Sequence, residues 1–304
     1  MAKTKKYLIA LVGPTAVGKT AVSILLANHF KSEILSADSR QFYKEMSIGT
    51  AVPSKEELAE VLHHFIQHIS ITDDYNVGDY ERDALQLLEE KLKTHTLLFM
   101  VGGSGLYVDA VVKGLDTFPD VDPKIREELQ EIYDRKGLEP LQEQLKKRDP
   151  EYFQKVDIQN PHRLIRSLEV CIESGMPYSS FLGKNKPKRD FEVIKIGLQA
   201  DRKVLYDRIN RRVDLMMEAG LLEEARKLKN KKHLNALQTV GYKELFSYFE
   251  NEISLEKAIE EIKKNSRRYA KRQLTWLRKD EAIEWFEYNE NIENIINYIK
   301  LRTS

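Results

Sequence analysis

The sequence predicts an α/β protein with a parallel sheet like that of the phosphate-loop NTPases, an inserted helical lobe and a helical C-terminal part. Three observations predict it. Apolar strand patterns alternate with helical patterns over the first third of the chain, which is typical of a parallel sheet covered by helices. A glycine-rich turn joins the first strand to the first helix. A highly charged, mostly helical stretch then separates the strand at 97–101 from the next one at 193–198.

The first elements are short and strongly patterned. Six apolar or aromatic residues at 7–12 predict a buried strand, and 21–27 predicts the helix that follows the glycine-rich turn. The segment 33–38 predicts a second strand that ends in the carboxylate of Asp38. These three elements place the turn and Asp38 at the same edge of a parallel sheet.

The next elements continue the alternation. We expect loop or short helix at 39–43 and 48–51, and a further strand at 63–69. A helix is predicted from about Val77 to His95. The apolar run at 97–101 predicts a fully buried central strand.

The pattern changes from Asp116 onward. We predict an inserted helical lobe over 119–189, which leaves 1–118 and 190–304 as the core. Asn160 followed by Pro161 is a strong helix start, because Asn caps helix N-termini and proline is tolerated at the first helical position. From Arg202 to Lys279 the chain is predicted to be nearly all helical. Breaks are expected at Gly220, Gly241 and Asn251.

Composition excludes several classes of protein. The 304 residues are 41% hydrophobic and 32% charged with a formal net charge of +1, which excludes fibrous and disordered chains. No apolar run approaches the roughly 20 residues of a membrane span, so we expect no membrane partner. The single cysteine, Cys171, cannot form an internal disulfide and favours a reducing compartment. We therefore expect a cytoplasmic protein, acting as a monomer.

The turn after the first strand matches the phosphate-loop pattern G-x-x-x-x-G-K-[ST]. Its residues are Gly13, Pro14, Thr15, Ala16, Val17, Gly18, Lys19 and Thr20. Glycines let backbone N–H groups converge on phosphate oxygens, the helix N-terminus and Lys19 add positive charge, and Thr20 can hold Mg²⁺. The pattern predicts a di- or triphosphate ligand. It leaves open which compound binds and whether phosphoryl transfer is the reaction.

Asp38 is the first residue that argues against a nucleotide hydrolase. Many phosphate-loop NTPases carry a Mg²⁺-supporting aspartate at the end of an apolar strand, whereas 97–101 runs into glycines. Only the strand at 33–38 delivers a carboxylate to the crevice, where it could hold a metal through water, act as a base, or merely cap the following turn. Ser104 lies in a second glycine turn after a strand. A metal site at His63, His64 and His68 is not favoured, because no carboxylate cluster accompanies these residues.

Two arginine pairs and one basic helix are candidate anion-binding features. Arg163 and Arg166 share one helix face, and Arg208 and Arg212 share another, although solvent-exposed helices often carry such pairs. From 257 to 280 nine Lys and Arg residues face three acidic ones. Tyr269 and Trp276 are interleaved with them, which suits a nucleic-acid backbone. The basic residues we expect to contact it are Arg268, Lys271 and Arg272.

Taken together, these segments closely resemble the tRNA dimethylallyltransferase family. The motifs in order are GPTAVGKT at 13–20, SADSRQFYKEMSIGTAVP at 36–53, VGGSGLY at 101–107, NPHRLIRSLEV at 160–170, VGYKE at 240–244 and RRYAKRQLTWLR at 267–278. The combination is highly specific, although the first motif alone would fit many kinases. Some eukaryotic relatives add a C-terminal zinc finger, so a chain with one cysteine resembles the bacterial type.

The resemblance implies transfer of a dimethylallyl group from dimethylallyl diphosphate to the exocyclic amine of the adenosine directly 3′ of the tRNA anticodon, with release of diphosphate. It implies that Lys19, Arg212 and Thr20 with Mg²⁺ stabilise the leaving charge and that Asp38 accepts the amine proton. The implied tRNA contacts are Asp38, Ser39, Arg40, Gln41, Ser104, Arg126, Gln159, Asn160, Pro161, His162 and Arg163. The family often has Thr where this chain has Ser104, which keeps the hydroxyl. The alternative is an ATP-dependent small-molecule kinase, which would need the same turn but no basic, aromatic helix.

Overall fold

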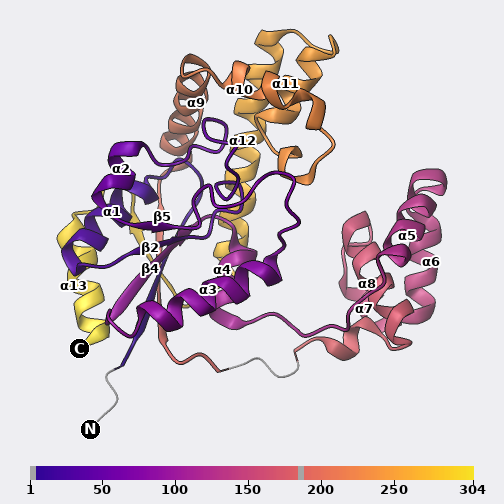
Figure 1. The fold of residues 1–304 in the computed structure, drawn as a ribbon, viewed down its shortest axis with the longest axis horizontal. Helices are drawn as coiled ribbons and strands as arrows, with labels where there is room; N and C mark the ends of the chain where they lie inside the picture. The colour runs from indigo at the N-terminus through magenta and orange to yellow at the C-terminus, as the bar shows by residue number, and fades with distance from the viewer. Residues whose placement is uncertain (1–4, 184–187) are drawn as a thin grey trace. The chain divides into compact units, whose positions relative to one another are not determined.

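The computed structural model describes residues 5–183 and 188–304 (Figure 1). The chain divides into two compact units. One comprises Met1–Val112 and Arg189–Ser304, and the other comprises Lys113–Lys188. The first unit holds the sheet and the C-terminal helices, and the second is helical in the part that the structure describes. The predicted lobe at 119–189 lies within the second unit except for its last residue.

A six-stranded parallel sheet forms the centre of the first unit, with strand order β3-β2-β4-β1-β5-β6. Every residue of β1 is buried, because β4 and β5 flank it and helices cover both faces. The strands are β1 (Tyr7–Val12), β2 (Ile34–Ser36), β3 (His63–His64), β4 (Leu97–Gly102), β5 (Glu192–Gln199) and β6 (Ile283–Glu287). The predicted parallel sheet is confirmed, and the second unit is inserted between β4 and β5.

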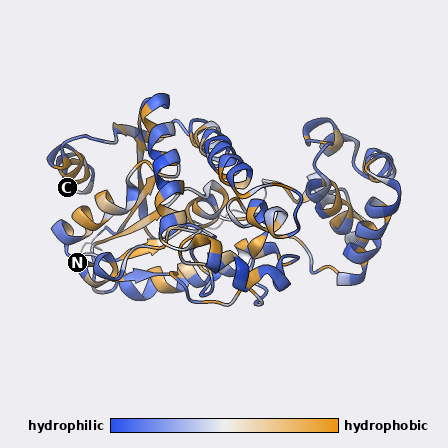
Figure 2. Ribbon diagram, turned by 90° about the horizontal axis from the view of Figure 1, so that it is seen from above, coloured by the Kyte–Doolittle hydropathy of each residue, from blue (hydrophilic) through white to orange (hydrophobic). Residues whose placement is uncertain are grey.

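Alternate residues of β1 face opposite cores, as the two-residue period of a strand requires. Ile9 and Leu11 face a core that contains residues of α1, α9 and α13, whereas Leu8 and Ala10 face a core that contains residues of α3 and α4. Figure 2 shows the strands coloured hydrophobic and much of the helical surface coloured hydrophilic. The helices of these layers are α1 (Lys19–Phe30), α3 (Val77–Lys91), α4 (Gly105–Lys113), α9 (Arg202–Glu218) and α13 (Ile292–Thr303).

A third core lies among the helices that follow β5. Leu221, Leu237, Leu245 and Ile262 are buried there, and Met46 joins them from the segment after β2. The remaining elements of this unit are α2 (Lys55–Glu60), α10 (Leu221–Leu228), the short 3₁₀ helices η2 (Lys229–Lys231) and η3 (Asn235–Leu237), α11 (Tyr242–Phe249) and α12 (Leu255–Leu277). Gly220 and Gly241 have positive φ angles immediately before α10 and α11, and Asn251 has one in the turn after α11. These are the predicted breaks.

The second unit has a small core of its own. Leu129, Leu141, Leu145, Leu164 and Leu168 are buried in it. Its helices are α5 (Pro123–Lys136), α6 (Glu139–Arg148), α7 (Pro150–Lys155), α8 (Pro161–Ser174) and the 3₁₀ helix η1 (Tyr178–Phe181). As predicted, the Asn160 side chain caps α8, accepting from the backbone N–H groups of His162 and Arg163.

Two sequence predictions need correction. The strand predicted at 63–69 is limited to His63–His64, because Phe65 and Gln67 adopt positive φ angles that end it. The helix predicted to reach His95 ends at Lys91. After Lys279 no element is predicted from the sequence, but β6 and α13 lie there and complete the sheet and one of its cores.

Within residues 5–183 and 188–304, no helix is both long enough and apolar enough to cross a membrane. The longest helix, α12, has 23 residues, but its C-terminal half carries several exposed basic side chains.

Candidate active site

The turn between β1 and α1 has the backbone shape that the phosphate-loop pattern predicts. Gly13 and Gly18 have φ angles of 153° and 109°, which residues with a Cβ rarely adopt. A Cβ on Gly13 would lie 2.6 Å from the carbonyl oxygen of Leu198 in β5. The turn therefore needs glycine at these positions, both for its conformation and for its approach to the neighbouring strand.

Lys19 begins α1 and folds back over the turn. Its Nζ donates hydrogen bonds to the carbonyl oxygens of Gly13 and Pro14, at 3.0 and 2.8 Å. Burial lowers the pKa of Lys19 to about 8, while the nearby Asp38 carboxylate opposes the shift and the Arg212 cation adds to it. A desolvated ammonium at this position is poised to gain from an anion.

Two arginines of α9 hold the same turn from the other side. Arg208 Nε donates to the carbonyl oxygen of Ala16 at 2.8 Å, and Arg212 Nη1 donates to Thr15 Oγ1 at 3.2 Å. Burial lowers the pKa of the Arg212 guanidinium, and Asp38 opposes that shift. The pair that shares a helix face in the sequence therefore converges on the turn in the structure.

Asp38 follows β2 and faces these cations. Its Oδ1 accepts from the backbone N–H of Arg40 at 3.1 Å, so the carboxylate also shapes the next turn. Burial lowers the pKa of both Lys19 and Arg212, and the negative charge of Asp38 opposes that lowering. The Asp38 side chain therefore caps the turn at Arg40 and also lies opposite the cations of the phosphate-loop turn.

Two cavities of similar size meet at Asp38. The first, here called the loop cavity, has a volume of about 690 Å³ and is lined by Lys19, Thr20, Arg208 and Arg211 among others. The second, here called the helix cavity, has a volume of about 710 Å³ and lies among the 38–50 segment, α9, α11 and α12. Residues that line both are Thr15, Ala16, Asp38 and Arg212.

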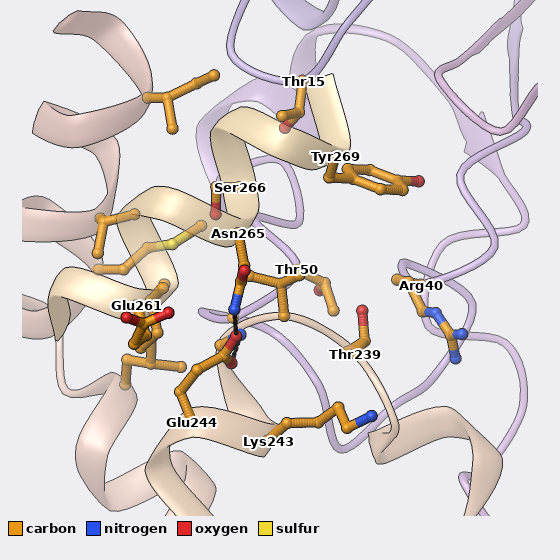
Figure 3. Close-up of a pocket in the computed structure, with 18 of the residues that line it drawn as sticks. Thr15, Arg40, Thr50, Thr239, Lys243, Glu244, Glu261, Asn265, Ser266 and Tyr269 are labelled. Atoms are coloured by element: carbon orange, nitrogen blue, oxygen red, sulfur yellow. Dashed lines mark hydrogen bonds between the residues drawn. The ribbon is translucent and has the colours of Figure 1, made fainter. Parts of the chain in front are cut away.

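The helix cavity has a mixed polar and apolar wall (Figure 3). Tyr269 and Asn265 project into it from α12, and Arg40 and Thr50 approach it from the segment after β2. Asn265 donates to Glu244 Oε1 at 2.7 Å. Burial raises the pKa of the Tyr269 phenol, so this ring stays neutral. The wall therefore combines an aromatic ring and an amide with four basic and three acidic side chains.

The second glycine turn brings Ser104 to the segment after β2. Ser104 Oγ lies 3.4 Å from Ser39 Oγ. A Cβ on Gly102 would lie 2.6 Å from the backbone of Ala37, so the two segments can approach this closely only with glycine there. Ser104 therefore contacts the residue that directly follows Asp38.

The other candidates of the segment after Asp38 have partners within the protein. Gln41 Nε2 donates to the carbonyl oxygens of Thr50 and Ala51 at 3.3 and 2.9 Å. Arg40 Nη1 donates to the carbonyl oxygens of Asn235 and Ala236, both at 3.1 Å. These bonds give the segment a defined shape before any ligand binds.

In the second unit the candidates divide into exposed and engaged residues. Gln159, His162 and Arg163 are exposed at the start of α8, with Asn160 and Pro161 beside them. Arg126 Nε and Arg166 Nη1 both donate to the buried carboxylate of Glu169, at 2.8 and 2.5 Å. Arg166 thus supports α8 and is half-buried, whereas Arg163 of that predicted pair is exposed.

Only part of the basic run on α12 faces solvent. Arg268, Lys271 and Arg272 are exposed. Earlier in the run, Lys263 pairs with Asp214 at 2.5 Å and Lys264 with Glu261 at 3.0 Å. The exposed basic face is therefore shorter than the sequence pattern suggests, and it lies toward the C-terminal end of α12.

The described residues include no group of three or more His, Cys, Asp or Glu side chains that could hold a metal. His64 instead contacts Glu33 at 2.6 Å, and His68 lies among aromatic rings that include Phe42 and Phe65. Thr20 and Asp38, however, both line the loop cavity. A hydroxyl and a carboxylate beside a phosphate site are the few hard oxygen donors that Mg²⁺ takes from a protein, so the donor set fits that ion.

Two residues that organise the site were not identified from the sequence. Glu224 of α10 accepts the backbone N–H groups of Ser47, Ile48 and Gly49 at 2.8 to 3.0 Å. Gln273 of α12 contacts both glycine turns. Gln273 lies inside the quoted motif at 267–278, but nothing in its spacing points to these partners.

Comparison with known proteins gives a consistent result. A family model described as IPP transferase matches residues 41–280. A tRNA dimethylallyltransferase of Christiangramia forsetii is 60% identical over 294 residues, covering 97% of each chain, and one of Flavobacterium johnsoniae is 58% identical over 300 residues with the same coverage.

Solved structures agree. The tRNA isopentenylpyrophosphate transferase of Bacillus halodurans has a TM-score of 0.73 at 39% identity, covering 99% of this chain and 97% of the other. A eukaryotic dimethylallyltransferase solved acting on tRNA has a TM-score of 0.78 at 25% identity, covering 94% of this chain and 75% of the other.

Proposed function

Since this chain belongs to the IPP transferase family and transfers a dimethylallyl group to tRNA, we propose that dimethylallyl diphosphate is the donor and that its diphosphate occupies the turn at 13–20. The acceptor in this proposal is the exocyclic amine of the adenosine directly 3′ of the anticodon. The observation that carries the proposal is the position of Asp38, which lines both the cationic loop cavity and the helix cavity. The relatives give no support to the kinase alternative.

The loop cavity suits the leaving group. As the bond between the allylic carbon and oxygen breaks, negative charge grows on the diphosphate. Lys19, Arg208 and Arg212 surround that position, and a low-dielectric site strengthens their effect. Charge stabilisation at the leaving group, rather than phosphoryl transfer, is then the task of the phosphate-loop turn.

The helix cavity suits the acceptor base. An adenine stacked in the anticodon loop cannot reach Asp38, so it must be unstacked at a cost of a few kcal/mol. Tyr269 offers a ring face, and Asn265 and Thr50 offer polar atoms along the wall. Recognition of single-stranded RNA commonly combines stacking with hydrogen bonds to base edges.

Asp38 completes the proton balance. The amine nitrogen forms a bond to the allylic carbon, the bond from that carbon to the diphosphate oxygen breaks, and the electron pair leaves with diphosphate. The amine lone pair is delocalised into the ring, so loss of an N–H proton to the Asp38 carboxylate favours the transfer. A positioned carboxylate base typically contributes a factor of about 10² to 10⁴.

Thr20 and Asp38 would hold Mg²⁺, directly or through water. The ion would neutralise part of the charge on the bound diphosphate. Lys19 and the two α9 arginines do the same with side chains that the structure already places there.

The proposed tRNA surface has two parts, described separately. The first unit offers Arg268, Lys271 and Arg272 on α12, and the second unit offers Gln159, His162 and Arg163 around the start of α8. Basic side chains neutralise phosphates whichever tRNA is bound, so these residues supply affinity more than specificity. We also propose that the protein acts as a monomer, since residues of one chain line both cavities, and that it acts in the cytoplasm, because a single cysteine favours a reducing compartment.

Incubation with unmodified tRNA and Mg²⁺, and with either dimethylallyl diphosphate or ATP, tests the proposal. We expect a prenylated adenosine next to the anticodon with the first donor and no phosphorylated product with ATP. Mass spectrometry of nuclease digests locates the modified nucleoside. Modification elsewhere in the tRNA would contradict the acceptor assignment, and ATP turnover without prenylation would contradict the donor assignment.

A further inference from the structure

Gln273 cross-links the two glycine turns. It lies on α12 and is 7% exposed. Its Oε1 accepts from the backbone N–H of Thr15 in the first turn at 2.9 Å, and its Nε2 donates to the carbonyl oxygen of Gly103 in the second turn, also at 2.9 Å. Both ends of the carboxamide are therefore bonded to backbone groups of loops that lie far from it in the sequence.

The first turn is held at one residue from two helices. Thr15 donates its backbone N–H to Gln273 of α12, while its hydroxyl accepts from Arg212 of α9. The Thr15 amide is the kind of group that could otherwise turn toward water or adopt another conformation. Its bond to a buried acceptor removes that freedom, and an unpaired buried N–H would be costly.

The second turn approaches Gln273 more closely than a residue with a side chain could. A Cβ on Gly103 would lie 2.2 Å from Gln273 Nε2. Neighbouring residues of α12 fix the helix along the same turn: Trp276 packs against Gly105 and its Nε1 donates to Asp109 at 3.2 Å. These contacts fix the position of α12 along the second turn, so that the Gln273 carboxamide lies between the two turns.

We propose that Gln273 is a positioning residue that sets the diphosphate-binding turn relative to Asp38. The link runs from Thr15 through the carboxamide to the second turn, whose Ser104 lies beside Ser39 and hence next to Asp38. The inference rests on the proposed function, because it takes the first turn to hold the diphosphate. It assigns to Gln273 no contact with substrate.

Gln273→Met tests the link, because it keeps the side-chain volume but removes both hydrogen bonds. We expect amide exchange in the 13–18 segment to be at least about tenfold faster than in the wild type, and the Kd of inorganic diphosphate to rise about tenfold. The Kd of tRNA should stay within about twofold, because Gln273 is buried away from the exposed basic face. A merely structural role would weaken both ligands together.

Gln273→Glu separates the two bonds. The carboxylate still accepts from Thr15 but cannot donate to Gly103, so exchange at 13–18 should stay close to wild type while single-turnover transfer slows at least about tenfold. Thr275→Ala, an exposed change on the same helix, is the matched control and should alter neither quantity.

The inference would be overturned if both Gln273 variants are folded and have the same amide exchange, diphosphate affinity and transfer rate as the wild type. A wild-type protein that fails to bind diphosphate at all would instead overturn the proposed function. The two failures are therefore distinguished by the wild-type binding measurement alone. Thermal melting of each variant checks that it is folded.

Discussion

The loop cavity and the helix cavity have nearly the same volume, about 690 and 710 Å³, but they differ in the balance of charge and in the aromatic content of their walls. Four basic side chains line each cavity, but two acidic side chains accompany them in the loop cavity and three in the helix cavity. The helix cavity also has the Tyr269 ring and the Asn265 amide in its wall. Volume alone would give the two cavities equivalent roles. The larger excess of basic over acidic side chains makes the loop cavity suitable for a diphosphate, and the Tyr269 ring with the Asn265 amide makes the helix cavity suitable for a base.

The two cavities also differ in how the chain builds them. The loop cavity is lined by the phosphate-loop turn and the first residues of α1, together with the segment after β2, the end of β4 and α9, but by no residue of α11 or α12. The helix cavity is assembled from the segment after β2, from α9 and from helices more than 200 residues after the turn. Asp38 and Arg212 line both cavities, so substitutions of either residue should affect events at the proposed diphosphate site and at the proposed base site.

The largest effect is expected at the shared wall. Asp38→Ala removes the proposed base and should lower the single-turnover rate about 10³-fold, while diphosphate affinity measured without Mg²⁺ stays largely unchanged. Rapid-quench measurement of prenyl transfer at saturating substrates gives the rate. Asp38→Asn retains the acceptor oxygen for the Arg40 amide and so controls for the shape of the turn. An unchanged rate in both variants would exclude Asp38 as the base.

A smaller effect is expected when one cation of the loop cavity is removed. Arg212→Ala loses a partly buried guanidinium and its bond to Thr15, so kcat/KM for dimethylallyl diphosphate should fall about 10²-fold. Arg226→Ala, which removes an arginine paired with Glu223 on α10, is the control. If both variants lose activity equally, the loop cavity has no special need for Arg212.

The pH dependence of donor binding should report Lys19. Its pKa of about 8 means that the free protein carries the charge below pH 8 and loses it above. The terminal phosphate of the donor is already ionised in this range, since its second pKa is about 6. Affinity for the donor should therefore be greatest below pH 8 and fall up to about tenfold per pH unit above it. Lys19→Met should bind weakly at every pH with no such slope, and a slope that persists there would assign the titration to another group.

The smallest effect is expected at the exposed face of α12. Reversing the charge at Arg268 and Lys271 should weaken tRNA binding and reduce the slope of log affinity against log salt by about one to two. Donor affinity should be unchanged, because neither residue lines a cavity. Arg135→Glu, a reversal on exposed α5, tests whether any lost positive charge has the same effect. An unaltered slope in the double variant would remove this face from the tRNA surface.

Local signals were sufficient to predict the sheet core and the turn. The phosphate-loop pattern fixes Gly13 and Gly18 because a few consecutive backbone angles decide the shape of the turn. The cap at Asn160 is equally local. These features depend on neighbours within a few residues, and the sequence shows such neighbours directly.

Features that depend on tertiary contacts were not predictable. Arg166 and Arg212 belong to similar arginine pairs, yet the first supports Glu169 and the second reaches Thr15. Spacing shows that two side chains share a helix face, but it does not show what that face packs against. The strand predicted at 63–69 failed for a related reason: after His64 the backbone leaves β2, Phe65 packs against His68, and Ile69 pairs with Tyr43.

The bond between Thr15 and Gln273 has a consequence for protein synthesis. Its two residues are 258 positions apart, so at about 5 to 20 residues per second the ribosome adds the second roughly 10 to 50 seconds after the first. Similarly, β1 can pair with β4 on one side early, but its other side stays unpaired until β5 has been synthesised. A growing chain therefore carries the complete phosphate-loop motif for most of its synthesis without the contact that shapes it, and it should acquire donor affinity only when its last helices are in place.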